Sequence, residues 1–133
     1  MSTANIEDIY PLSPMQQGML FHSLYAPETG VYFEQSTWTV RGNLDIRAFE
    51  RAWQHTLNRH AVLRTSFIWE NVDEPLQIVH REVTLPLQKQ DLRGLSPDQQ
   101  REQIEAFLKK DREKGFDLSE APLMRLALLQ TGE

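Results

Sequence analysis

The chain has no cysteine among its 133 residues, and this absence limits both its chemistry and its compartment. Without thiols it can form no disulfide framework, no thiolate zinc site and no cysteine nucleophile, which fits a reducing cytosol. No run of about 18 apolar residues occurs, as a membrane span would need. The N-terminal segment MSTANIEDIY also lacks the basic and apolar regions of a signal peptide. We therefore expect a cytoplasmic protein without a membrane partner.

A clustered positive charge is missing as well. The 14 basic residues are scattered among 19 acidic ones, and the net charge is -5. Because nucleic acids and anionic membranes bind a concentrated positive field, we expect neither as a partner. The four histidines, His22, His55, His60 and His80, lack metal-ligand spacing, and no glycine-rich phosphate loop follows a strand. We expect no metal site, and the residue pattern alone names no catalytic residue.

Two short segments are typical of a helix N-terminus. SPMQ at 13–16 and SPDQ at 96–99 each place a serine before a proline, with a glutamine three residues after the serine. In such a capping box the serine side chain accepts from a backbone N–H, and the glutamine side chain reaches back to the serine N–H. We predict helices that start at Ser13 and Ser96, and we interpret Ser13 and Gln16 as a structural cap.

Apolar residues at helical spacing set the extent of three helices. The first is predicted to end near Tyr25, before Pro27, and a second to run from a cap at Asp45 to near His60. The third is predicted to end at Gly115, a plausible left-handed terminator. The residues of the first helix that we expect to face the core are Met15, Met19 and Leu20.

Strand signals separate these helices. Segments 31–40, 64–70 and 76–82 are rich in β-branched and aromatic residues, and the last two are predicted to form a hairpin. Segment 123–129 is almost wholly apolar, as expected of a strand covered on both faces. The pattern predicts an α/β or α+β two-layer sandwich, in which helices pack on a mixed or antiparallel sheet.

Three segments together resemble one family. LSPMQQGMLFHSL at 12–24 and RHAVLRTSF at 59–67 resemble the first and second core motifs of condensation domains from nonribosomal peptide synthetases, in the family's order. KGFDLSEAPLMRLALL at 114–129 is similar to the stretch before their third motif. The resemblance covers residues 8–130, which is nearly the whole chain.

The resemblance implies a fold and a reaction. Condensation domains resemble chloramphenicol acetyltransferase, with two α/β lobes around a tunnel that receives phosphopantetheine arms of donor and acceptor carrier domains. They join aminoacyl or peptidyl thioesters into a peptide bond, bind no cofactor directly and adjoin an adenylation domain in the full synthetase. The methionine start suggests that the polypeptide begins here, at the head of a synthetase subunit.

The catalytic signature of the family is absent from the chain. That signature, His-His-x-x-x-Asp-Gly, would be expected shortly after Leu129, so the catalytic histidine is expected to lie beyond Glu133, the last residue of the sequence. Residues 1–133 are therefore expected to be an incomplete N-terminal subdomain, without the signature loop and without the C-terminal lobe. Such a fragment contains no catalytic residue and is expected to be inactive by itself.

Three basic residues of the second motif invite a functional interpretation. Arg59 and His60 end a helix, where cations complement the negative end of the dipole. Arg64 is predicted at the first position of a strand, and a buried guanidinium needs a carboxylate or several carbonyls. The resemblance implies that Arg64, with Arg59 and His60 beside it, supports the catalytic loop through the loop's aspartate. The alternative is that Arg64 pairs with a local acid such as Glu70 or Glu82.

Two aromatic residues of the first motif lie on one helix face. Phe21 and Tyr25 are four residues apart and offset from the predicted core face. The resemblance implies that they contact the acceptor carrier domain, and the alternative is burial beneath a loop. Two other functions remain open, a noncatalytic carrier- or partner-binding module and a related acyltransferase, epimerization or heterocyclization domain.

Overall fold

The computed structural model describes residues 3–26 and 32–132. The helices are α1 (Pro14–Tyr25), α2 (Ile46–Arg59) and α3 (Pro97–Lys114), with 3-10 turns η1 (Thr3–Asn5) and η3 (Ala61–Arg64). The strands are β1 (Ile6–Pro11), β2 (Thr65–Ile68), β3 (Leu76–His80), β4 (Leu87–Asp91) and β5 (Leu126–Gln130). The predicted mixture of helices and sheets is confirmed.

Three residues that the sequence analysis used as boundaries lie outside the described residues. Pro27 and Val31 bound a predicted helix and a predicted strand, and Glu133 is the residue beyond which the catalytic histidine is expected. The expectation that this histidine follows Glu133 therefore stays a prediction from the sequence.

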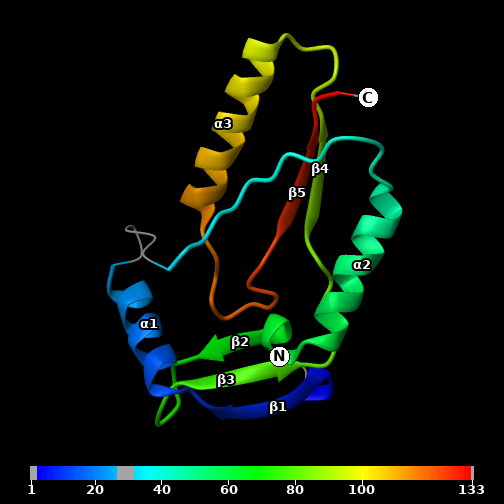
Figure 1. Cartoon of the computed structure of the whole chain (residues 1–133). Helices are drawn as coiled ribbons and strands as arrows, with labels where there is room; N and C mark the ends of the chain where they lie inside the picture. The colour runs from blue at the N-terminus through cyan, green and yellow to red at the C-terminus, as the bar shows by residue number, and fades with distance from the viewer. Residues whose placement is uncertain (1–2, 27–31, 133) are drawn as a thin grey trace.

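The first sheet is antiparallel, with strand order β1-β3-β2 (Figure 1). Ile78 in the central strand pairs with Ile9 on one side and with Ser66 on the other. The hairpin predicted from segments 64–70 and 76–82 is confirmed, although both strands are shorter than predicted. Strand β1 was not predicted, because Glu7 and Asp8 interrupt its apolar alternation.

The second sheet pairs β4 and β5 in parallel, and α3 connects the two strands. In Figure 1, α2 and α3 lie on opposite sides of this pair. The predicted strand at 123–129 is confirmed over residues 126–129, but its side chains are half-buried rather than covered on both faces. Within the described residues only β4 pairs with β5, so its other edge has no strand beside it.

The strand predicted at 31–40 is wrong over its described part, because residues 33–40 form neither strand nor helix. They run as an extended segment from the region of α1 towards α2 (Figure 1). Trp38 is 84% exposed, and Val40 is exposed as well. Among the described residues no strand pairs with this segment, and β-propensity without a hydrogen-bonded neighbour does not produce a strand.

The helix starts are confirmed. Asp45 accepts from the Ala48 N–H at 3.1 Å, both serine capping boxes form, and α3 ends at Gly115, whose φ is +57°. The core face predicted for α1 is partly wrong, since Met15 and Met19 are exposed and Leu20 alone of the three is buried.

The buried apolar core is small and contains residues from α1, α2, β3 and the connecting loops. Its members among the described residues are Leu12, Leu20, Leu57, Ile78, Val79, Leu85 and Leu92. The Gln54 side chain connects α2 to the segment before β4. Its Nε2 donates to Val83 O at 2.7 Å, and its Oε1 accepts from Leu85 N at 3.0 Å. The Phe67 N–H donates to Leu118 O at 2.8 Å, which joins the first sheet to the segment that precedes β5.

Candidate functional site around Arg64

Arg64 is buried, with 5% of its surface exposed, at the end of the short turn η3. It does not open a strand as predicted, because the chain from His60 first forms a 3-10 turn and β2 begins at Thr65. Thr65 Oγ1 donates to Ala61 O at 2.9 Å, and Leu63 N donates to His60 O at 3.0 Å. These hydrogen bonds fix the backbone around Arg64 and therefore the direction of its side chain.

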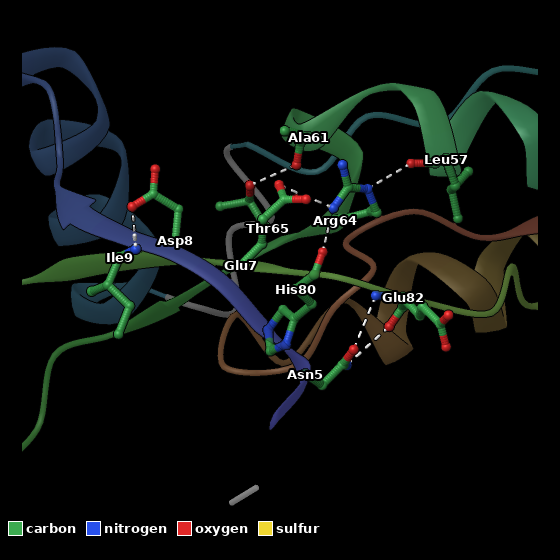
Figure 2. A network of polar contacts seen from close by, with 10 residues as sticks. All are labelled: Asn5, Glu7, Asp8, Ile9, Leu57, Ala61, Arg64, Thr65, His80 and Glu82. Atoms are coloured by element: carbon green, nitrogen blue, oxygen red, sulfur yellow. Dashed lines mark hydrogen bonds and ion pairs between the residues drawn. The ribbon is translucent and has the colours of Figure 1, made fainter. Parts of the chain in front are cut away.

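The Arg64 guanidinium bonds to three segments of the chain (Figure 2). Nε donates to Leu57 O in α2 at 2.9 Å, and Nη1 donates to His80 O at the end of β3. Nη1 also lies 3.5 Å from Glu7 Oε2 in β1. Two carbonyls and one carboxylate thus offset the desolvation of the buried charge.

The alternative, in which Arg64 pairs with an acid, is correct in kind, but the acid is Glu7 rather than Glu70 or Glu82. Glu82 instead bonds through its backbone to Asn5, by Glu82 N to Asn5 Oδ1 (3.0 Å) and Asn5 Nδ2 to Glu82 O (3.0 Å). Among residues 3–26 and 32–132, Nη2 of Arg64 has no hydrogen-bond partner. No buried side-chain nitrogen or oxygen among the described residues lacks a partner, so Nη2 reaches the surface, where its two N–H donors are open to solvent or to another group.

A serine and a histidine lie beside this arginine on strands β2 and β3. Ser66 Oγ and His80 Nε2 are 2.7 Å apart, and Ser66 is completely buried. Burial lowers the pKa of the His80 imidazole below its ordinary value of 6.5, which favours the neutral ring. Because the carbonyl of His80 accepts from Arg64, the pair helps to fix one acceptor of the guanidinium.

Arg59 and His60 do not join this network. Both side chains are exposed, and within the described part of the chain neither has a hydrogen-bond partner. Arg59 ends α2 and His60 is its C-cap, with its N–H bonded to Thr56 O at 3.0 Å. The structure therefore does not group them with Arg64, and the predicted role of both remains a prediction.

The aromatic pair predicted on α1 is exposed. Phe21 and Tyr25 are 62% and 80% exposed, and their rings stack with centroids 5.8 Å apart at 11°. His22 meets Phe21 edge-on at 5.6 Å and lies 6.4 Å from the Tyr32 ring. The alternative of burial beneath a loop is wrong for both aromatics in this structure.

The structural cap predicted for Ser13 and Gln16 is confirmed. Ser13 N donates to Gln16 Oε1 at 2.8 Å, and Gln16 N donates to Ser13 Oγ at 3.2 Å. The side-chain amides of Gln16 and Gln77 of β3 also form hydrogen bonds with each other, at 3.2 and 3.0 Å. Gln77 Nε2 in addition donates to Pro11 O at 3.1 Å. The cap therefore also fixes α1 to the first sheet.

Within the described residues, no three His, Cys, Asp or Glu side chains gather as metal ligands would. In the same part of the chain, no helix combines the length and apolarity needed to cross a membrane.

Residues 6–133 match the family described as the condensation domain. The chain belongs to the condensation domain family. It is 51% identical over 129 residues to a linear gramicidin synthase polypeptide of Brevibacillus parabrevis, a match that covers 97% of the chain and 2% of that protein. Against a mycosubtilin synthase polypeptide of Bacillus subtilis the identity is 46% over 128 residues, covering 96% of the chain and 5% of that protein.

Solved condensation domains share the fold. A variant of the starter condensation domain of rhizomide synthetase superposes with a TM-score of 0.75 at 20% identity, over 94% of this chain and 30% of that one. The likeness confirms the predicted α/β fold of condensation domains. The chain spans a few per cent of the length of these synthetases and 30% of the solved chain, so it is a segment of a condensation domain.

Sequence reasoning missed a second arginine of this condensation domain segment. Arg125 Nε donates to Asp111 Oδ1 at 2.6 Å, and its other nitrogens donate to Asp111 O (2.7 Å) and Gly115 O (2.5 Å). Its guanidinium carbon lies 4.2 Å from the Phe116 ring centroid and 5.7 Å from that of Phe33. A lone arginine within an apolar stretch was the available signal, because a half-buried guanidinium requires partners.

Proposed function

We propose that the chain is the N-terminal part of a condensation domain that forms peptide bonds in a nonribosomal peptide synthetase. One observation carries the proposal besides family membership. Arg64, in the segment that resembles the second core motif, is buried yet keeps an Nη2 donor pair without a partner among the described residues. The N–H donors of this one cationic nitrogen can bind a carboxylate oxygen.

The proposed reaction joins two thioesters carried on the phosphopantetheine arms of donor and acceptor carrier domains. The acceptor amine attacks the donor carbonyl carbon, a C–N bond forms and the C–S bond breaks. The donor arm leaves as its thiol, and the amine loses one proton. The arms are substrates, and no cofactor is bound directly. The expected His-His-x-x-x-Asp-Gly loop, which would assist this proton transfer, is not in the sequence, so residues 1–133 are proposed to be inactive alone.

In this proposal Arg64 supports the catalytic loop by donating from Nη2 to the loop's aspartate. Such a contact would complete the hydrogen bonding of a guanidinium whose other two nitrogens are already held by Leu57 O and His80 O. We describe this role as positioning, because Arg64 is proposed to contact the loop and not the reacting atoms.

The partners proposed for the domain are the two carrier domains and an adjoining adenylation domain. We assign the stacked pair Phe21 and Tyr25 to the acceptor carrier contact, since exposed aromatics on a rigid helix provide contact area at little entropic cost. A cytoplasmic location remains a prediction from the sequence.

A second candidate function is a carrier- or partner-binding module without chemistry. The exposed pair Phe21 and Tyr25 favours it, because such a surface serves binding whether or not catalysis follows. Reading the coding sequence beyond Glu133 distinguishes these two functions. Two adjacent histidines followed by Asp-Gly after Glu133 support catalysis, and their absence supports the module. An epimerization, heterocyclization or other acyltransferase domain would differ in the same region.

The proposed function is tested with loaded carriers and intact-protein mass spectrometry. The complete domain is expected to transfer the donor acyl group to the acceptor carrier, whereas residues 1–133 alone are expected to give product at the uncatalysed rate only. The control is the complete domain with both signature histidines replaced by alanine. Product from the 133-residue chain well above that control would contradict the proposal.

A further inference from the structure

Glu7 occupies an irregular position in strand β1. Ile6 is paired with His80 and Asp8 with Val79, so β1 advances by two residues where β3 advances by one. Glu7 is the extra residue of this β-bulge. In a regular strand its side chain would point away from the face used by both neighbours, but a bulge re-aims the extra side chain.

The bulge directs the Glu7 carboxylate to the arginine of the second motif. Figure 2 shows Glu7, His80 and Arg64 together at the end of the first sheet. Glu7 Oε2 lies 3.5 Å from Nη1 of Arg64, the same nitrogen that donates to the His80 carbonyl. His80 is also the register partner of Ile6, so the bulge and the arginine contact lie at one place in the sheet.

Charge makes this contact different from the others that Arg64 makes. The Arg64 side chain is 6% exposed, and the carbonyls of Leu57 and His80 are neutral. Among the described residues Glu7 alone forms an ion pair with it. The Glu7 side chain is 44% exposed, so the pair contributes little to stability, and its main effect is on orientation.

We propose that Glu7 is a positioning residue for Arg64, held at its place by the bulge in β1. With Nε bonded to α2 and Nη1 bonded to both β3 and β1, the guanidinium plane is fixed and Nη2 faces one direction. This inference rests on the proposed function, in which Nη2 supports the catalytic loop. It adds that the Glu7 carboxylate determines the direction in which Nη2 of Arg64 points.

The test uses the complete condensation domain with loaded donor and acceptor carriers. Glu7→Gln is expected to lower kcat about fivefold, the upper range for a half-exposed ion pair, with KM for the acceptor carrier unchanged. Glu7→Lys is expected to lower kcat by more than about tenfold, because it places two cations beside each other.

Asp8→Asn and Asp8→Lys are the matched controls, since Asp8 is exposed, accepts from Ile9 N at 2.9 Å and does not contact Arg64. The controls are expected within about twofold of wild type.

A double substitution separates positioning from a merely structural role. In the Arg64→Gln background, Glu7→Gln is expected to have no further effect on kcat. An equal loss in both backgrounds, or no loss from Glu7→Gln and Glu7→Lys in an otherwise active domain, overturns the inference. If Arg64→Gln does not fold, the Glu7 and Asp8 series still decides. If Arg64→Gln folds with unchanged kcat, the proposed role of Arg64 fails instead.

Discussion

His80 links the chemistry of a single residue to the stability of the first sheet. Burial lowers the pKa of its imidazole, so the folded state binds this proton less tightly than the unfolded state. The corresponding stability is complete above pH 6.5, the ordinary pKa, and is lost as the pH falls through the lower folded pKa. Asp91 does not titrate in this range, because hydrogen bonds from Arg93 lower its pKa to about 2.

We predict that the complete domain unfolds at a lower urea concentration at about pH 5.5 than at about pH 7.5, and that His80→Gln reduces this difference. Glutamine keeps a hydrogen-bonding group for Ser66 but has no proton to bind. His55→Gln, at an exposed position, is the control and is expected to leave the difference unchanged. An identical pH response in wild type and His80→Gln would show that the histidine contributes nothing.

At the scale of elements, Arg125 joins three segments that are distant in sequence. It lies before β5, bonds to the last turn of α3 and faces Phe33 of the extended segment. The Asp111 carboxylate that it binds also accepts from Gln35 Nε2 at 2.9 Å. Two carbonyls at the C-terminal end of α3, Asp111 O and Gly115 O, thus accept from a side chain that precedes β5.

We predict that Arg125→Met loosens the end of α3 and the start of β5. The carboxylate of Asp111 would lose its charge partner in a half-buried setting, at a cost of about 2 to 3 kcal/mol. Hydrogen exchange followed by mass spectrometry is expected to show faster exchange in residues 110–116 and 124–128. Arg101→Met, which removes an exposed pair with Asp98, is expected to change neither region. Unchanged protection in the Arg125 variant would contradict the assignment.

The elements that could be predicted from sequence are those with local signals. Capping boxes and apolar periodicity located α1, α2 and α3, and the hairpin of β2 and β3 followed from alternation around a turn. Strand β4, with the sequence LQKQD, is polar and takes its conformation from pairing with β5. The segment 33–40 has strand propensity but no strand beside it among the described residues. In both segments, the presence or absence of a neighbouring strand determined the conformation, and local propensity did not.

The same distinction applies to the candidate site. The motif located Arg64, and the rule that a buried guanidinium needs a carboxylate or several carbonyls predicted the kind of partners that it has. Glu7 could not be identified as its partner, because a bulge is needed to aim it and no local pattern announces one. Gln77 was likewise missed, since its contact with Gln16 joins residues 61 positions apart.

At the scale of the molecule, the chain exposes more surface than a compact protein of its size. Its accessible surface is 10114 Å², whereas a folded monomer of 15.5 kDa is expected to expose about 7,200 Å². The excess includes large apolar side chains such as Met15, Phe21, Tyr25, Trp38 and Val40. This matches a segment that covers 30% of a solved condensation domain.

We predict that residues 1–133 alone self-associate or melt at a clearly lower temperature than the complete domain. Each large apolar side chain left in water forfeits about 1.5 to 3 kcal/mol, and a net stability of about 5 to 15 kcal/mol tolerates few such losses. Size-exclusion chromatography with light scattering over a tenfold concentration range, beside thermal melting, checks this. A monomer with a sharp, concentration-independent transition would mean that the segment is self-sufficient.

The strand order of the first sheet has a consequence for the growing polypeptide on the ribosome. Strand β1 pairs with β3, so the N-terminal strand has no partner until residues 76–80 have left the exit tunnel. Once they have, Glu7, Leu57, Arg64 and His80 are all outside the tunnel, whereas β5 leaves it later. The surroundings of Arg64 can therefore be assembled during synthesis before β5 has emerged.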